Sequence, residues 1–299
     1  LGQFIRVPYC CKILSDFGAE IIKVETPGLG DVSRRYGPFP EESPHQERSG
    51  LFIYLNGNKI GVTLDVSDYR GKEALLKLIS KSDLVVDEYR PKERDEIGLN
   101  YDVLKAINPR LIVTSITAFG QKGPYSNYKG HSLQLAAGSV ASRIGDPDRP
   151  PLSTQLYQPD YYAGLHGCAA SLVALEARNF TGSGQFVDIS AMECLSNGYG
   201  SITMGNIFHK LTSDSPRGGY RSNSLYPIET ITCKDGYFNI TTTIVPHWKR
   251  YLQVMGNPEW AKDSRVQNLE RGYVEEHRDE LDANQMDWLS NYTKEELWK

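Results

Sequence analysis

The sequence lacks long apolar runs, an excess of positive charge and a regular cysteine pattern. Its 299 residues are 39% hydrophobic and 23% charged, with a formal net charge of −4. No apolar stretch approaches the roughly 20 residues of a membrane-spanning helix, and no basic segment followed by an apolar one opens the chain as a secretory signal. The acidic balance gives no electrostatic footprint for nucleic acid or an anionic membrane. We therefore expect a globular cytoplasmic protein, of one large domain or two, that binds neither nucleic acid nor membrane.

Cysteines and nucleotide-binding motifs are also scarce. The five cysteines are Cys10, Cys11, Cys168, Cys194 and Cys233. Their odd number and the lack of CxxC spacing favour free thiols in a reducing cytoplasm. No GxGxxG follows the first expected strand and no GxxxxGK[ST] occurs, which disfavours a nicotinamide dinucleotide or P-loop site. We expect no permanently bound cofactor and no metal.

Short apolar strands alternate with helical patterns along the first part of the chain. Strands are expected near residues 20–25, 61–64, 84–87 and 111–116, and helices near residues 8–17, 68–81 and 101–107. This alternation predicts an α/β fold, a Rossmann-like and mostly parallel sheet flanked by helices. Ligands bind at the carboxyl ends of such strands. The loops after residues 25, 64, 87 and 116 are therefore the expected ligand wall.

The last third of the chain has a different pattern. Residues 213–220 have the composition of a linker, and a β-hairpin is expected within residues 228–242. A helix over residues 247–255 spaces its aromatic side chains for a core. We predict a large domain over residues 1–212 and a smaller α+β domain over residues 221–299. Both are expected to be incomplete, because the chain begins at Leu1 rather than Met and stops beside a helix start.

One carboxylate, Asp160, precedes a long run of small and apolar residues that ends at Arg178. Pro159 suits the first turn of a helix, where Asp160 would meet unpaired backbone N–H groups. An Asp at this position is often only a cap. However, Gly164 and Gly167 each cost a helix about 1 kcal/mol relative to Ala, so they indicate close approach of a neighbouring backbone or ligand. A turn at residues 181–185, a strand at 186–189 and a helix opening near Ser190 follow.

This stretch resembles the class III CoA-transferases, also called CaiB/BaiF, a family that includes formyl-CoA transferase and carnitine CoA-transferase. The shared features are the Asp, the alanine-rich helix, an Arg, TGxGQ and a VDIS-like strand; GAEIIKVE near the start and TAFGQKGP after residue 116 fit as well. The resemblance implies that Asp160 is a nucleophile. It implies an acyl-CoA:carboxylate CoA-transferase that uses an aspartyl anhydride and an aspartyl-CoA thioester. An acyl-CoA donor, a small carboxylic acid acceptor and an interlocked homodimer are expected with it.

The resemblance also implies residues that contact coenzyme A. By family position the contacting segments are residues 5–6, 64–67, 88–90 and 129–132. Within them the expected contacts are Arg90, Lys129, Tyr89, Leu64 and Arg6. The three cations carry the charge that CoA phosphates require, and the tyrosine ring suits stacking on adenine.

The chain departs from the formyl-CoA transferase pattern in several places. Thr26 stands where that branch has an Arg, and a second phosphate-contacting Arg falls at Glu96 or, with a small gap, at Arg94. The glycine-rich loop of that branch is absent, and residues 241–246 look more like the carnitine-type branch. These differences argue against formyl or oxalyl substrates.

Two other functions remain open. The α-methylacyl-CoA racemases share the fold and use a His–Asp arrangement for proton abstraction. Here His131 lies one place from the family position and no Asp follows it. The third alternative is a non-catalytic CoA-binding or dimer-forming fragment.

Overall fold

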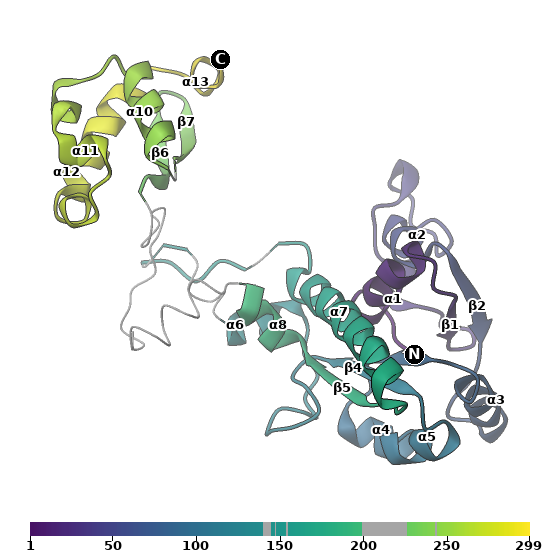
Figure 1. The fold of residues 1–299 in the computed structure, drawn as a ribbon. Helices are drawn as coiled ribbons and strands as arrows, with labels where there is room; N and C mark the ends of the chain where they lie inside the picture. Colours follow the sequence, from purple (N-terminus) through teal and green to yellow (C-terminus); the bar gives the residue numbers. More distant parts are fainter. Residues whose placement is uncertain (140–144, 147, 154, 199–225, 243) are drawn as a thin grey trace. The chain divides into compact units, whose positions relative to one another are not determined.

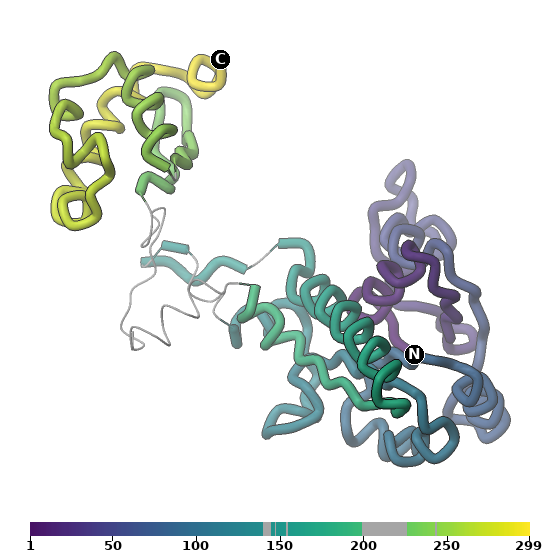
Figure 2. Tube along the Cα trace, viewed as in Figure 1, coloured from purple at the N-terminus to yellow at the C-terminus, as the bar shows by residue number. Residues whose placement is uncertain are grey.

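A computed structural model describes residues 1–139, 145–146, 148–153, 155–198, 226–242 and 244–299 (Figures 1 and 2). The chain forms two compact units, a large one within residues 1–142 and 153–213 and a small one within residues 143–152 and 214–299. The linker expected at residues 213–220 lies outside the described residues, so the predicted domain boundary stays a prediction.

The described strands of the large unit pair in parallel. Strand β1 (Ile21–Glu25) pairs with β2 (Lys59–Thr63), and a second sheet has the order β3 (Leu84–Asp87), β4 (Ile112–Thr117), β5 (Phe186–Ser190). All residues of β4 are buried, as expected for a central parallel strand covered on both faces. The predicted α/β class with parallel strands and flanking helices is confirmed, with the strands divided between two sheets (Figure 1).

Helices flank these strands. In the large unit they are α1 (Arg6–Asp16), α2 (Gly50–Asn56), α3 (Tyr69–Ile79), α4 (Pro91–Ile97), α5 (Tyr101–Ile107), α6 (Ser132–Gly138), α7 (Gln158–Thr181) and α8 (Ala191–Gly198), with 3₁₀ turns η1 (Val32–Arg35) and η2 (Pro40–Glu42). The predicted helices correspond to α1, α3, α5, α7 and α8. The prediction of a loop after residue 87 is wrong in part, because α4 begins at Pro91 and ends before Gly98, which has a φ of +65°.

Helix α7 packs directly against α1 and β4. A Cβ atom on Gly164 would lie 2.7 Å from the backbone oxygen of Arg6, and one on Gly167 would lie 2.4 Å from Cδ1 of Ile116. At Gly164, where the neighbouring atom belongs to the backbone, only glycine permits this approach. The structure therefore confirms that the two glycines of α7 mark a close neighbour, and the neighbour of Gly164 is the first turn of α1.

The small unit contains the predicted hairpin. Strands β6 (Ile228–Cys233) and β7 (Gly236–Thr241) are antiparallel, and α10 (Val245–Val254), η4 (Glu259–Lys262), α11 (Ser264–Gln267), α12 (Arg271–Leu289) and α13 (Lys294–Trp298) follow. Trp248 is fully buried and donates its indole N–H to the carbonyl oxygen of Val266 at 2.8 Å. The expected core role of this aromatic cluster is confirmed. Among the described helices, none is both long and apolar enough to cross a membrane.

Candidate active site

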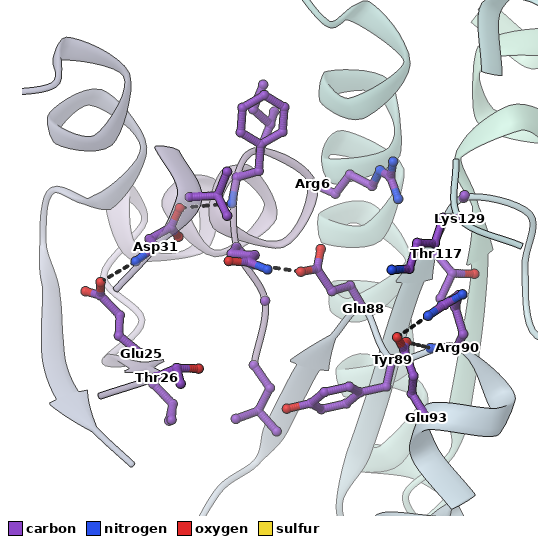
Figure 3. A pocket seen from close by; sticks show the side chains of 18 of the residues that line it. Arg6, Glu25, Thr26, Asp31, Glu88, Tyr89, Arg90, Glu93, Thr117 and Lys129 are labelled. Carbon is purple, nitrogen blue, oxygen red and sulfur yellow. Dashed lines mark hydrogen bonds and ion pairs between the residues drawn. The ribbon is translucent and has the colours of Figure 1, made fainter. Parts of the chain in front are cut away.

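A cavity of about 550 Å³ opens in the large unit at the carboxyl ends of the parallel strands (Figure 3). Thr26, Leu64, Glu88 and Thr117, each from one of the four loops that the sequence singled out, line it. Figure 3 shows Glu25, Thr26 and Asp31 on one side and Tyr89, Arg90 and Glu93 on the other. The expected ligand wall is thus one continuous surface.

All six predicted site residues line this cavity: Asp160, Arg90, Lys129, Tyr89, Leu64 and Arg6. They come from the first turns of α1 and α7 and from the loops after β2, β3 and β4. The structure brings them together; it does not test the role of any of them.

Asp160 lies in the first turn of α7, as predicted, and is only 2% exposed. Its carboxylate does not cap the helix. Instead Oδ1 accepts a hydrogen bond from Nε of Arg6 at 2.5 Å, and Oδ2 accepts one from the Ser132 hydroxyl group. Charged and hydroxyl donors from other elements therefore replace the expected backbone N–H groups of α7. Both oxygens of the only carboxylate that the resemblance marks as a nucleophile are engaged.

Arg6 lies between Asp160 and the loop before α6. Its Nη2 donates to the carbonyl oxygen of Gly130 at 2.7 Å, and its side chain is 14% exposed. We expected this guanidinium to face a CoA phosphate, and in the structure it faces the Asp160 carboxylate. The close packing at Gly164 explains how the first turn of α1 reaches this position.

Three further cations line the cavity beyond this pair, and one of them, Lys23, is paired with Asp31 at 2.5 Å. Arg90 forms an ion pair with Glu93 and donates to the carbonyl oxygen of Asn127 at 2.7 Å. Its hydrogen bond holds the pKa of Glu93 below the ordinary value. Lys129 is exposed, and among the described residues the structure gives it no ion pair within 4.0 Å. The cavity thus keeps one ammonium group available for an anionic ligand.

The loop after β3 adds an aromatic ring and a second acid. Tyr89 and Leu64 pack against the hydrophobic core, and burial raises the pKa of Tyr89 to about 12. Glu88 accepts a hydrogen bond from the backbone N–H of Gln3 at 3.0 Å, and burial raises its pKa to about 7. Sequence reasoning placed Glu88 in a contact segment but missed it as a titrating group, because no local pattern reports the burial of a loop carboxylate.

A buried ion pair supports the loop after β3 on the side away from the cavity. Arg94 Nη2 lies 2.5 Å from Asp87 Oδ1, and Ser115 Oγ donates to the same oxygen at 3.1 Å. Gln121 then bridges Ser115 Oγ and the carbonyl oxygen of Tyr89. Arg94 is 5% exposed and is not part of the cavity wall.

The two candidate positions for a second phosphate contact therefore differ. Arg94 is occupied by Asp87 and is unsuited to a phosphate, which corrects that alternative. Glu96 does line the cavity, but it brings a negative charge there. A phosphate would have to be held by other groups of this surface.

His131 and Ser132 follow the Gly130 carbonyl at the start of α6. The backbone N–H of His131 donates to Oε1 of Gln134 at 3.1 Å, and His131 is among the residues that line the cavity. Ser132 reaches Asp160 across 28 positions of sequence. The sequence placed Ser132 at the end of an expected CoA-contacting segment, residues 129–132, but missed its contact with Asp160, since only the fold brings α6 to the start of α7. Within the described part of the chain, no cluster of three or more His, Cys, Asp or Glu side chains is suited to a metal ion.

Comparison with known proteins gives a consistent result. The chain matches CoA-transferase family III over residues 1–299. It is 34% identical over 306 residues to succinyl-CoA:D-citramalate CoA-transferase of Chloroflexus aurantiacus, covering 99% of this chain and 72% of that protein. It is 33% identical over 278 residues to formyl-CoA:oxalate CoA-transferase of a Bradyrhizobium species, covering 86% and 64%.

A solved structure resembles the fold along the whole chain. A CaiB/BaiF family protein from Brucella suis superposes with a TM-score of 0.80 at 29% identity, covering 100% of this chain and 78% of the other. The two curated relatives are longer, and the chain spans about two thirds of their length.

Proposed function

The chain belongs to CoA-transferase family III, and from that premise we propose that it moves coenzyme A from an acyl-CoA donor to a small carboxylic acid, with Asp160 as the covalent carrier. The observation that carries the proposal is the placement of Asp160, 2% exposed in the wall of a cavity that also contains Arg90, Lys129 and Tyr89. The relatives that share the family are CoA-transferases at 29–34% identity.

The reaction proceeds by acyl relay. An Asp160 oxygen attacks the thioester carbonyl, the carbon–sulfur bond breaks, and CoA thiolate leaves a mixed anhydride. The thiolate attacks Cγ of Asp160, which releases the donor acid and leaves an aspartyl-CoA thioester. The acceptor carboxylate then attacks Cγ and expels the thiolate, which finally attacks the acceptor carbonyl and regenerates the Asp160 carboxylate. Every bond broken is replaced by one of the same type, so no metal or redox cofactor is required.

The surrounding groups suit these steps. Burial of Asp160 limits the access of water to the anhydride and thioester, both of which hydrolyse. Arg90 and Lys129 offer positive charge for CoA phosphates, and Tyr89 offers an aromatic ring at the same wall. We assign Arg6 to Asp160 rather than to a phosphate, because its guanidinium is engaged there.

The proposal also includes the choice of acyl-CoA donor. Three relatives carry names that begin with succinyl-CoA, so succinyl-CoA is the first donor to test. We also propose a cytoplasmic protein, because the five cysteines are free in a sequence without CxxC spacing. An interlocked homodimer belongs to the proposal through the family resemblance alone.

Trapping tests the covalent route. The full chain is incubated with succinyl-CoA, treated with hydroxylamine, digested and analysed by mass spectrometry. We expect a hydroxamate on the peptide that contains Asp160, and none with Asp160→Asn, which should still bind CoA in calorimetric titration. A wild-type protein that binds CoA and gives no adduct would overturn the proposal.

The racemase alternative is distinguished by isotope uptake. It requires deuterium exchange at Cα of a branched acyl-CoA without exchange of CoA between acids. The backbone N–H of His131 donates to Gln134, and no carboxylate neighbours His131 in sequence. We therefore do not propose this function.

A further inference from the structure

The two oxygens of Asp160 are held by donors of different charge. Oδ1 pairs with the guanidinium of Arg6, whereas Oδ2 accepts a hydrogen bond from the neutral hydroxyl of Ser132. Both hydrogen bonds end on a carboxylate, but only the contact with Arg6 adds the attraction of an opposite charge. Swinging a serine hydroxyl away requires one torsion, while breaking a buried ion pair leaves an uncompensated charge.

The guanidinium is also anchored at its far end. Nη2 of Arg6 donates to the Gly130 carbonyl at 2.7 Å. A Cβ atom on Gly130 would lie 2.7 Å from Cβ of Ala118, so this loop is packed tightly on the end of β4. Arg6 therefore bridges Asp160 and a fixed carbonyl, and it cannot follow a rotating carboxylate.

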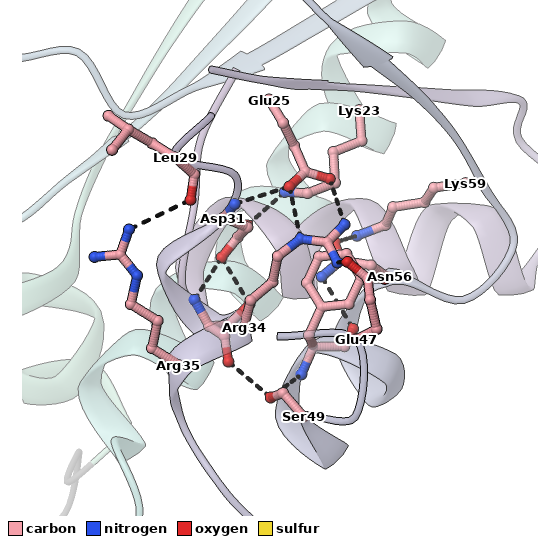
Figure 4. A network of polar contacts seen from close by, with 12 residues as sticks. Lys23, Glu25, Leu29, Asp31, Arg34, Arg35, Glu47, Ser49, Asn56 and Lys59 are labelled. Atoms are coloured by element: carbon pink, nitrogen blue, oxygen red, sulfur yellow. Dashed lines mark hydrogen bonds and ion pairs between the residues drawn. The ribbon is translucent and has the colours of Figure 1, made fainter. Parts of the chain in front are cut away.

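The backbone before Arg6 is tied to Asp31, which belongs to a polar network with Lys23 and Glu25 (Figure 4). The N–H of Phe4 donates to Oδ1 of Asp31 at 3.0 Å, and Lys23 Nζ lies 2.5 Å from Oδ2 of Asp31. The Phe4 ring packs edge-on against Tyr157, just before α7, with centroids 5.0 Å apart. The starts of α1 and α7 are thus tied together on both sides of the Arg6–Asp160 pair.

We propose that Arg6 is a catalytic residue that locks Oδ1 of Asp160 in place, so that only Oδ2 acts as the nucleophilic oxygen. This inference rests on the proposed function. In it the Ser132 hydroxyl turns away, Oδ2 attacks the thioester carbonyl, and Oδ1 becomes the carbonyl oxygen of the anhydride and of the thioester. Each attack on Cγ puts the new negative charge on Oδ1, which Arg6 already contacts, as an oxyanion requires.

The proposal fixes the fate of each oxygen atom. When the thiolate displaces the donor acid at Cγ, Oδ2 leaves with that acid. When the acceptor carboxylate attacks Cγ, one of its oxygens takes the vacated place and stays on Asp160 after the acceptor thioester departs. One oxygen is exchanged in each turnover, and with Oδ1 locked it is the same position every time.

Oxygen-18 labelling tests this directly. The full chain is allowed many turnovers with succinyl-CoA and an excess of succinate labelled at all carboxylate oxygens. It is then digested, and the mass of the peptide that contains Asp160 is measured by mass spectrometry. We expect the wild-type peptide to gain one oxygen-18 atom and to stop there. A gain of two atoms would show a freely rotating carboxylate and overturn the lock while leaving the relay intact. No gain would overturn the proposed function itself.

Variants separate a catalytic from a structural role. Arg6→Gln should gain both labelled atoms and lose about 100-fold in kcat, the scale of one oxyanion donor. Ser132→Ala should still gain one atom, because Arg6 remains. Arg35→Gln is the matched control, since this exposed arginine donates to the carbonyl of Leu29 and lies outside the cavity wall; it should behave as the wild type. Arg6→Gln that gains one atom like the wild type would overturn the lock even if its activity is low.

Discussion

At the scale of single residues, Glu88 is the acid whose ionisation should govern the pH dependence of stability. Burial raises its pKa to about 7 from an ordinary value of 4.5. Below pH 4.5 the carboxyl is protonated in both folded and unfolded chains and costs nothing. Between these values only the unfolded chain ionises, so the folded state loses stability as the pH rises, and above pH 7 the full penalty is present.

Glu88→Gln removes that penalty and keeps an acceptor for the Gln3 N–H. We expect the variant to melt at the same temperature as the wild type near pH 4, and above it by several degrees near pH 8. Differential scanning fluorimetry across this range checks the trend. Glu20→Gln, at an exposed position, serves as the control. A Glu88→Gln advantage that shrinks with rising pH would contradict the assignment.

Ionised Glu88 should also repel an incoming carboxylate. The KM for the acceptor acid should rise as the pH passes about 7, because one more negative charge then faces the cavity. Glu88→Gln should flatten the profile of KM against pH and leave kcat within about threefold. Steady-state rates with succinyl-CoA across that range provide the measurement, and an unchanged profile in the variant would refute the role of this side chain.

At the scale of elements, the contact between α1 and α7 determines whether Arg6 reaches Asp160. A methyl group on Gly164 would lie 2.7 Å from the Arg6 carbonyl. We expect Gly164→Ala to cost about 2 kcal/mol, as overpacking does, and to lower kcat by displacing Arg6. Gly61→Ala is the control in the same unit, since nothing lies within 4 Å of the added methyl group. Equal stability of the two variants would show that the helices separate freely.

The buried ion pair between Asp87 and Arg94 should keep the loop after β3 in the conformation that binds CoA. Asp87→Ala leaves Arg94 buried without its carboxylate, which costs about 3 kcal/mol. We expect CoA affinity to fall as well, because Tyr89 and Arg90 lose their support. The exposed pair Glu73–Lys77, 2.9 Å apart, is the control; Glu73→Ala should change the free energy of unfolding by less than about 0.5 kcal/mol. Chemical denaturation and calorimetry supply both readouts.

The elements also show where sequence reasoning stops. Helices α3, α5 and α7 were predicted because their apolar spacing or small-residue run is visible locally. Helices α2, α4 and α6 were missed. Each has only seven residues, and unlike α5, which is equally short, none is followed by an Asn-Pro stop signal. Two of them matter for the site, since α4 carries Arg94 and α6 carries Ser132.

At the scale of the whole molecule, the order of strands predicted which loops meet, and the cavity formed by those loops contains every predicted site residue. Which side chains pair with one another inside that cavity could not be predicted from the sequence. Arg6 and Asp160 are 154 positions apart, and a charge suited to a phosphate is equally suited to a carboxylate. Only the packing of α1 on α7 decides between the two.

The net charge of the chain indicates which groups attract CoA to the cavity. Because the net charge is −4, attraction of CoA phosphates must come from local cations of the cavity rather than from the overall field. Lys129→Ala should raise the Kd for CoA about tenfold at low salt, since a charge-assisted contact contributes about 1.5 kcal/mol. The ratio of variant to wild-type Kd should shrink at higher salt, because the Debye length falls to about 10 Å at about 0.1 M and the charges are screened. Lys122→Ala, an exposed lysine outside the cavity wall, should change the Kd less than about twofold. Equal effects of the two variants would place the phosphates elsewhere on the molecule.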